Sequence, residues 1–103
     1  MRIPDHVKVG GLIYDISFED RLLDDENTKV YGIIDYNNLT IKLEKLYSQQ
    51  KNEQSLWHEI VHAICAEYNV ELEDEDVDRI GCGLYQVIKD NPALFSDMVQ
   101  FMD

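Results

Sequence analysis

The chain has 103 residues, of which 21 are acidic and 9 basic, so its formal charge is −12, and 45% of its residues are hydrophobic. This length supports one hydrophobic core, and the hydrophobic fraction is that of a folded protein rather than a disordered one. So few lysines and arginines disfavour a surface that binds nucleic-acid phosphates or an anionic membrane. We therefore expect one domain, residues 1–103, with no nucleic-acid and no membrane partner.

The sequence carries no signal for export or membrane insertion. Its first residues, MRIPDHVKVGG, contain no apolar run of signal-peptide length, and no segment approaches the roughly 20 apolar residues of a membrane span. Cys65 and Cys82 lie in helical patterns rather than in a CxxC pair, which is typical of reduced thiols in a cytosolic protein. A disulfide between two helices, or Cys82 as a metal ligand, is the alternative.

Alternating apolar residues predict strands in about the first 45 residues. The stretch VKVGGLIYDISF has two such runs around Gly10 and Gly11, and KVYGIIDYNNLTIKL has two more around Asn37 and Asn38. Both patterns are typical of β-hairpins. We expect an antiparallel sheet of three or four strands with one side exposed to water, and an acidic loop at residues 19–27 that connects the hairpins.

Helical periodicity begins at about Ser48. Apolar residues then recur at three- and four-residue spacing, which predicts a helix that ends at Asn69. A second helix follows an acidic run at residues 71–78 and ends before Pro92, and a short third helix is expected at residues 93–102. Strands followed by helices indicate an α+β fold. The apolar positions of the second helix are Val77, Ile80, Gly81, Leu84, Val87 and Ile88.

The first helix contains the HExxH pattern, formed by His58, Glu59 and His62. Because residues four apart lie on one face of a helix, both imidazoles can bind one tetrahedral metal ion. In this motif the ion is zinc, and the glutamate is the general base that takes a proton from the zinc-bound water. The sequence therefore predicts one Zn²⁺ held by His58 and His62, with Glu59 as the catalytic residue.

A zinc site of this kind needs a third protein ligand, and the acidic run supplies candidates. If the second helix has begun by residue 74, Asp74 projects beside the apolar stripe of that helix, whereas Glu75 points into solvent. Asp78 lies one turn after Asp74, where it is expected to accept the free N–H of a ligating histidine. Because helix ends are uncertain by a few residues, Glu73 and Glu75 stay open as alternative ligands.

Three segments, SLWHEIVHAI, DEDVDRIG and GLYQVIKDNP, together resemble small phage and prophage proteins related to the ImmA/IrrE group of zinc metallopeptidases. The resemblance implies a minimal zincin-like domain, in which a small sheet packs on the HExxH helix and a second helix supplies the third ligand. The family pattern in that helix places Asp74 at the ligand position and Asp78 at an Asn or Asp position. It also implies a peptidase that acts on a protein substrate in the cytoplasm of a bacterial host.

Asp74 stands where the family has a glutamate, so its side chain is shorter by one methylene group. The two helices must approach closely if Asp74 is to reach the ion. Gly81 and Gly83 remove side-chain bulk where the helices are expected to cross.

Three tyrosines and one strand are candidates for contact with the substrate. Tyr14, Tyr36 and Tyr85 are candidate donors to the oxyanion, although the position of Tyr85 fits the core better. The strand at residues 39–43 is expected to be the sheet edge to which a substrate peptide adds. The alternative function is a non-catalytic acidic protein that binds a host protein through this fold, because residues 58–103 carry 11 acids and only 2 bases.

Overall fold

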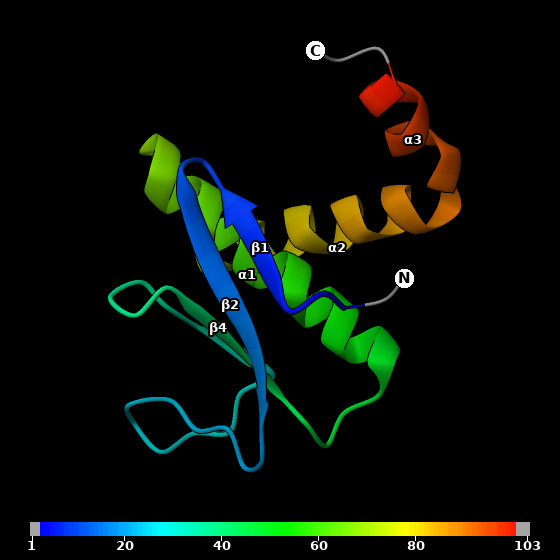
Figure 1. Ribbon diagram of the computed structural model, residues 1–103. Helices are drawn as coiled ribbons and strands as arrows, with labels where there is room; N and C mark the ends of the chain where they lie inside the picture. The colour runs from blue at the N-terminus through cyan, green and yellow to red at the C-terminus, as the bar shows by residue number, and fades with distance from the viewer. Residues whose placement is uncertain (1–2, 101–103) are drawn as a thin grey trace.

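A computed structural model describes residues 3–100, with their side chains as far as residue 96. The fold has four strands followed by three helices (Figure 1). This arrangement confirms the predicted α+β class. The helix predicted at residues 93–102 is present as far as residue 100, and its last two residues lie outside the described part. The elements are β1 (His6–Val9), β2 (Leu12–Glu19), β3 (Gly32–Asp35), β4 (Thr40–Glu44), α1 (Gln49–Tyr68), α2 (Asp74–Asp90) and α3 (Pro92–Gln100).

Both predicted hairpins form. β1 pairs antiparallel with β2 through a turn in which Gly10 has a φ of 61°, and β3 pairs antiparallel with β4. The order of the strands in the sheet is β1-β2-β4-β3, and β2 and β4 are parallel. The sheet is therefore mixed, and the prediction of a wholly antiparallel sheet is wrong.

The parallel pair arises because β4, rather than β3, lies next to β2. A hairpin that follows β2 can place either of its strands there, and the second strand then runs parallel to β2. Ile41 and Leu43 of β4 are completely buried, whereas all four residues of β3 keep partial exposure. The more deeply buried strand thus lies in the centre of the sheet, and β3 lies at its edge. Residues 39–43 are thus not an edge strand, which corrects the expectation for substrate binding.

α1 covers one face of the sheet and begins and ends where local chemistry predicts (Figure 1). The Ser48 hydroxyl accepts a hydrogen bond from the Lys51 backbone N–H at 3.2 Å, and Asn69 ends the helix with a φ of 59°. Apolar side chains of α1 pack against those of β1, β2 and β4 to form the core. The buried core residues are Val9, Tyr14, Ile41, Leu43, Leu56, Ile60 and Ala63.

α2 packs on α1, and among the described residues it contacts no strand. Its apolar stripe is consequently only partly covered. Ile80, Leu84 and Val87, which the periodicity places in the stripe, keep 44%, 37% and 49% of their surface exposed. No helix in the described residues combines the length and the apolar character needed to cross a membrane. The buried residues of α2 are Val77, Gly81 and Tyr85.

Candidate metal centre

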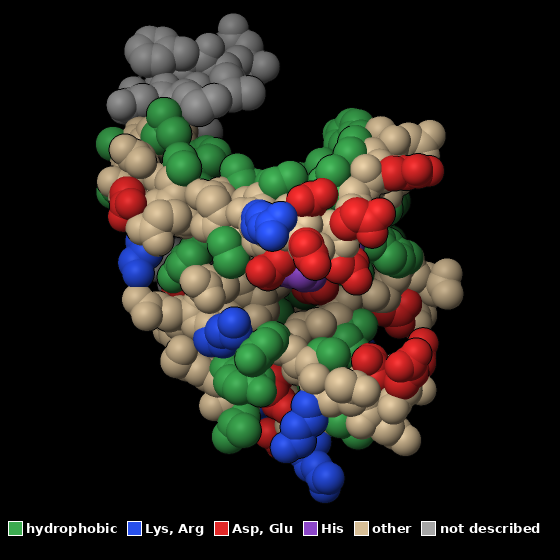
Figure 2. Space-filling model, turned by 180° about the vertical axis from the view of Figure 1, so that it is seen from behind, with side chains coloured by type: hydrophobic (Ala, Val, Ile, Leu, Met, Phe, Trp, Pro, Cys, Tyr) green, Lys and Arg blue, Asp and Glu red, His purple; other side chains and the backbone are tan. Residues whose placement is uncertain are grey.

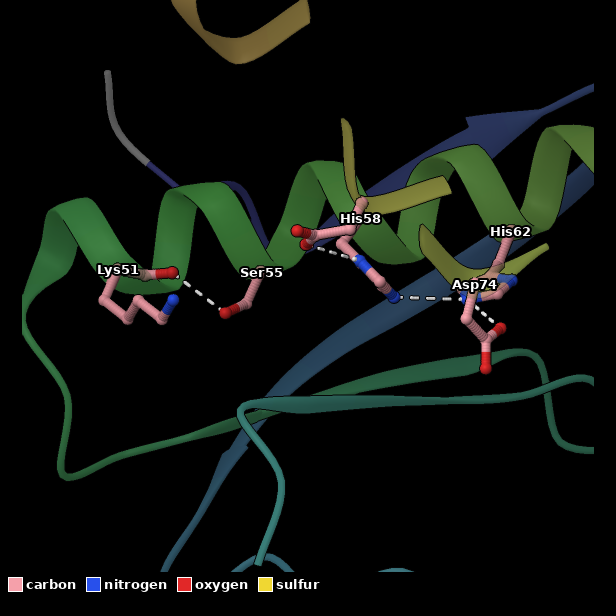
Figure 3. A network of polar contacts seen from close by, with 6 residues as sticks. Lys51, Ser55, His58, His62 and Asp74 are labelled. Atoms are coloured by element: carbon pink, nitrogen blue, oxygen red, sulfur yellow. Dashed lines mark hydrogen bonds and ion pairs between the residues drawn. The ribbon is translucent and has the colours of Figure 1, made fainter. Parts of the chain in front are cut away.

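His58, Glu59 and His62 lie together in the middle of α1. Each offers one ligand atom, and these three atoms lie within 4.8 Å of one another. The Nε2 atoms of His58 and His62 are 3.2 Å apart (Figure 3). Two nitrogen ligands at about 2.0–2.1 Å from a tetrahedral zinc ion lie about 3.3 Å apart, so the imidazoles already have the separation that one ion requires.

The His58 ring is oriented by α2. Its Nδ1 atom lies 3.2 Å from Oδ1 of Asp78, which favours the tautomer with the hydrogen on Nδ1 and leaves the Nε2 lone pair directed at His62. This is the contact expected for Asp78. A carboxylate that holds the far nitrogen of a metal-binding histidine also makes the ring a stronger ligand.

Of the predicted third ligands, Asp74 is the one that the structure brings next to a histidine of the motif. As the first residue of α2, it has Oδ1 at 4.0 Å from Nε2 of His62, and its side chain is 93% exposed and therefore free to rotate (Figure 3). Glu75 instead faces Arg79 at 3.7 Å, where both side chains are exposed. Glu73 is the exposed residue immediately before the helix. Of these three predicted candidates, only Asp74 lies within 4.0 Å of a histidine.

Glu59 is buried without a partner for one of its oxygens. The residue is 4% exposed, and Oε2 accepts no hydrogen bond from the described residues. Burial, together with the nearby charge of Asp74, raises the pKa of the Glu59 carboxyl to about 7. A base with a pKa near neutrality suits proton transfer at physiological pH. Burial and the neighbouring His58 lower the pKa of His62, which favours the neutral imidazole that binds metals.

Gly81 lets α2 reach the site. A Cβ atom at this position would lie 3.1 Å from both the backbone nitrogen and the Cα of His58, so the two helices touch at the first histidine. The expectation for Gly81 is thus confirmed. Gly83 is different, because a Cβ there would meet nothing within 4 Å, and the expectation that it too serves the crossing is wrong.

A cavity of about 320 Å³ opens beside His58, between α1, α2 and the chain that leads into β3. On the face drawn in Figure 2, acidic side chains surround a histidine next to a hollow in the surface. β3 passes close to the site, since a Cβ at Gly32 would lie 3.5 Å from Cγ of Glu59. The edge strand and the motif therefore form two walls of one cavity, whose lining includes Tyr31, Gly32, Lys51, Ser55, His58 and Glu59.

The structure distinguishes the three candidate tyrosines. The Tyr36 hydroxyl donates to the His62 carbonyl oxygen at 3.5 Å, and burial together with the charge of Glu59 raises the pKa of Tyr36. Tyr14 and Tyr85 are each 3% exposed, and Tyr85 donates to Oε1 of Glu53 at 2.8 Å. Only Tyr36 thus combines exposure with contact to the motif.

Lys51, in the wall of the cavity, is not among the residues predicted from the sequence. Lys51 lies seven residues before His58 and Ser55 lies three before it, so all three share one face of α1 (Figure 3). The signal was available, because helical spacing from His58 leads directly to both positions. Cys65 and Cys82 are free thiols, each partly buried, as expected for reduced cysteines.

Comparisons of the chain with models of protein families, with curated proteins and with solved structures found no significant match. The resemblance to the ImmA/IrrE group therefore stays a prediction.

Proposed function

We propose that this protein is a zinc-dependent hydrolase of the peptidase type that binds one Zn²⁺ and acts on a protein substrate. The separation of 3.2 Å between the Nε2 atoms of His58 and His62 is the observation that supports it most. The buried Glu59 with its unpartnered oxygen adds the base that such a reaction needs. A phage-encoded protein in the bacterial cytoplasm is the setting that the sequence resemblance implies.

His58, His62 and Asp74 are the proposed ligands. Zinc in such a site acidifies a bound water and polarises the substrate carbonyl. Glu59 accepts the proton from the attacking water and delivers it to the leaving amine. Asp78 keeps the His58 ring in the ligating tautomer.

Two further groups have proposed roles in binding the substrate. The Tyr36 hydroxyl is the proposed donor to the oxyanion that develops on the carbonyl oxygen, and this bond would replace its long one, 3.5 Å, to the His62 carbonyl. β3 is an edge strand that passes beside Glu59, so an extended peptide can pair with it and run past the motif.

The proposal is tested with Glu59→Gln, which preserves shape and removes the base. We expect this variant to bind zinc like the wild type and to lose hydrolysis of a fluorescence-quenched peptide library by at least about 100-fold. Equal hydrolysis by both proteins would show that Glu59 is not the base. Hydrolysis that survives removal of zinc by a chelator would reject the metal-dependent reaction itself.

A non-catalytic binding protein is the second candidate function. The exposed apolar residues Ile80, Leu84 and Val87 of α2 lie on the helix whose first turn carries Asp74, Glu75 and Asp76. Together these residues suit a partner that is both apolar and basic. Capture of the same basic protein from host lysate by wild type and by Glu59→Gln, with no cleavage by either, would favour this function over hydrolysis.

A further inference from the structure

The cavity extends along α1 away from the histidines. Lys51 and Ser55 line it together with His58, and Figure 3 shows these side chains in a row on one side of the helix. Two helical turns separate Lys51 from His58, which corresponds to about 10 Å along the axis. An extended peptide covers this distance with about three residues.

The Lys51 ammonium group is held in position by an aromatic ring. Its Nζ atom lies 4.0 Å from the centroid of the Tyr31 ring, and the Tyr31 ring packs against that of Tyr47 at 4.7 Å between centroids. Tyr31 also lines the cavity. A cation–π contact fixes the ammonium while leaving its N–H groups able to donate to another partner.

A second lysine, Lys29, also lines this cavity. Backbone contacts fix the chain from Lys29 to Tyr31. Lys29 forms a β-bridge with Leu23, and the Tyr31 carbonyl oxygen accepts a hydrogen bond from the Glu44 backbone N–H at 3.0 Å. Among the described residues, neither Lys29 nor Lys51 forms an ion pair with a carboxylate. Two cations therefore share the wall of a cavity in a chain whose acids outnumber its bases by 21 to 9.

We infer that this end of the cavity binds a carboxylate of the peptide substrate, within about three residues of the bond that is cleaved. The inference rests on the proposed function, because it places the peptide relative to the metal centre. The acidic groups of the cavity, Glu59 and Asp78, lie at the other end beside the histidines, so charge changes along its length. The net charge of −12 acts against an anionic ligand only weakly, because charges more than about 8 Å away are screened at physiological salt.

The carboxylate can belong to an acidic side chain or to the C-terminus of the substrate, and a set of inhibitors distinguishes these sources. The first series consists of peptides with a zinc-chelating hydroxamate at the N-terminal end. Three of these peptides end in a carboxamide and differ only in one residue, which is Glu, Gln or Lys, and a fourth has Gln and a free C-terminal carboxylate. A second series has the same Glu, Gln and Lys variants with the hydroxamate at the C-terminal end, so that both sides of the cleaved bond are sampled. Binding is measured by calorimetry on the zinc-loaded protein.

We expect one carboxylate-bearing inhibitor to bind about tenfold more tightly than its neutral counterpart, the usual size of a charge-assisted hydrogen bond. Lys51→Met combined with Lys29→Met should reduce this preference to less than about twofold, because Met keeps the apolar stem and removes the charge. Lys51→Arg should retain it. Lys8→Met is the matched control, since Lys8 lies on β1 at the opposite edge of the sheet.

The possible outcomes separate this inference from the proposed function. A Glu preference identifies a side-chain carboxylate, and a preference for the free terminus identifies a C-terminal one. Zinc-dependent binding of all inhibitors without any preference for a carboxylate would overturn the inference and leave the proposed function standing. A preference that survives the double lysine variant would overturn it as well. Absence of zinc-dependent binding would overturn both.

Discussion

The contact between Gly81 and His58 gives a sharp prediction about how α2 is held on α1. Gly81→Ala places a methyl group 3.1 Å from two backbone atoms of His58, and backbone cannot rotate away as a side chain would. Gly83→Ala, two residues later in the same helix, places a methyl group where nothing lies within 4 Å. Both variants make the same chemical change, but only Gly81→Ala alters the contact between α2 and the backbone of α1.

The magnitude follows from two opposing effects. Replacing glycine by alanine inside a helix stabilises it by up to about 1 kcal/mol, and overpacking a tight contact costs about 1–3 kcal/mol. The helix effect is common to both variants, so their difference isolates the contact. We expect Gly83→Ala to raise the free energy of unfolding by about 0.5–1 kcal/mol. Gly81→Ala should lower it by up to about 2 kcal/mol relative to the wild type, because the cost of the tight contact exceeds the same gain in the helix.

The assay is urea unfolding of the metal-free proteins, followed by far-ultraviolet circular dichroism. Zinc affinity of the folded variants is measured in parallel, because a displaced α2 also moves Asp78 away from His58. We expect Gly81→Ala to bind zinc more weakly and Gly83→Ala to bind it as the wild type does. Equal stability of the two variants would refute the close helix crossing.

Three further predictions concern polar side chains of α1 and α2. In metal-free protein the pKa of Glu59 is about 7 rather than 4.5, so the folded state holds its proton more tightly than the unfolded state and loses stability as pH rises through this window. A glutamine side chain does not titrate, so the free energy of unfolding of Glu59→Gln minus that of the wild type should increase by about 3 kcal/mol between pH 4.5 and 8. A difference that does not change with pH would contradict the raised pKa. Tyr85→Phe removes the donor to Glu53 and should cost about 1–3 kcal/mol in urea unfolding, whereas no loss would mean that the bond contributes nothing. Asp78→Asn should weaken zinc binding about 10- to 100-fold in competition with a chromophoric chelator, and unchanged affinity would remove Asp78 from the site.

Local features of the fold were predictable from the sequence because neighbouring residues determine them. Ser48 and Asn69 mark the ends of α1 through their own capping chemistry, and Gly10 permits the left-handed turn of the first hairpin. The order of the strands was not predictable in this way. It depends on which strand of the second hairpin carries the side chains that the core encloses, and the alternation in β3 and β4 permits both answers.

The candidate site likewise contains features that one helix determines and features that depend on how the elements pack. The spacing of His58 and His62 is a property of one helix, whereas the orientation of the His58 ring also depends on Asp78 of α2. Tyr36 is near the motif only because β3 lies at the edge of the sheet beside α1, which no local pattern reveals. The exposure of Ile80 has a similar cause, because among the described residues α2 contacts only the helices α1 and α3.

Equilibrium zinc binding to the untagged protein tests whether the two histidines of α1 form a metal centre. We expect one zinc ion per chain for the wild type and a loss of at least about 100-fold in affinity for His58→Ala. We expect no change for His6→Ala, which removes an exposed histidine of β1 outside the cluster. A wild type that binds no zinc, or equal affinities for the wild type and His58→Ala, would contradict the metal centre.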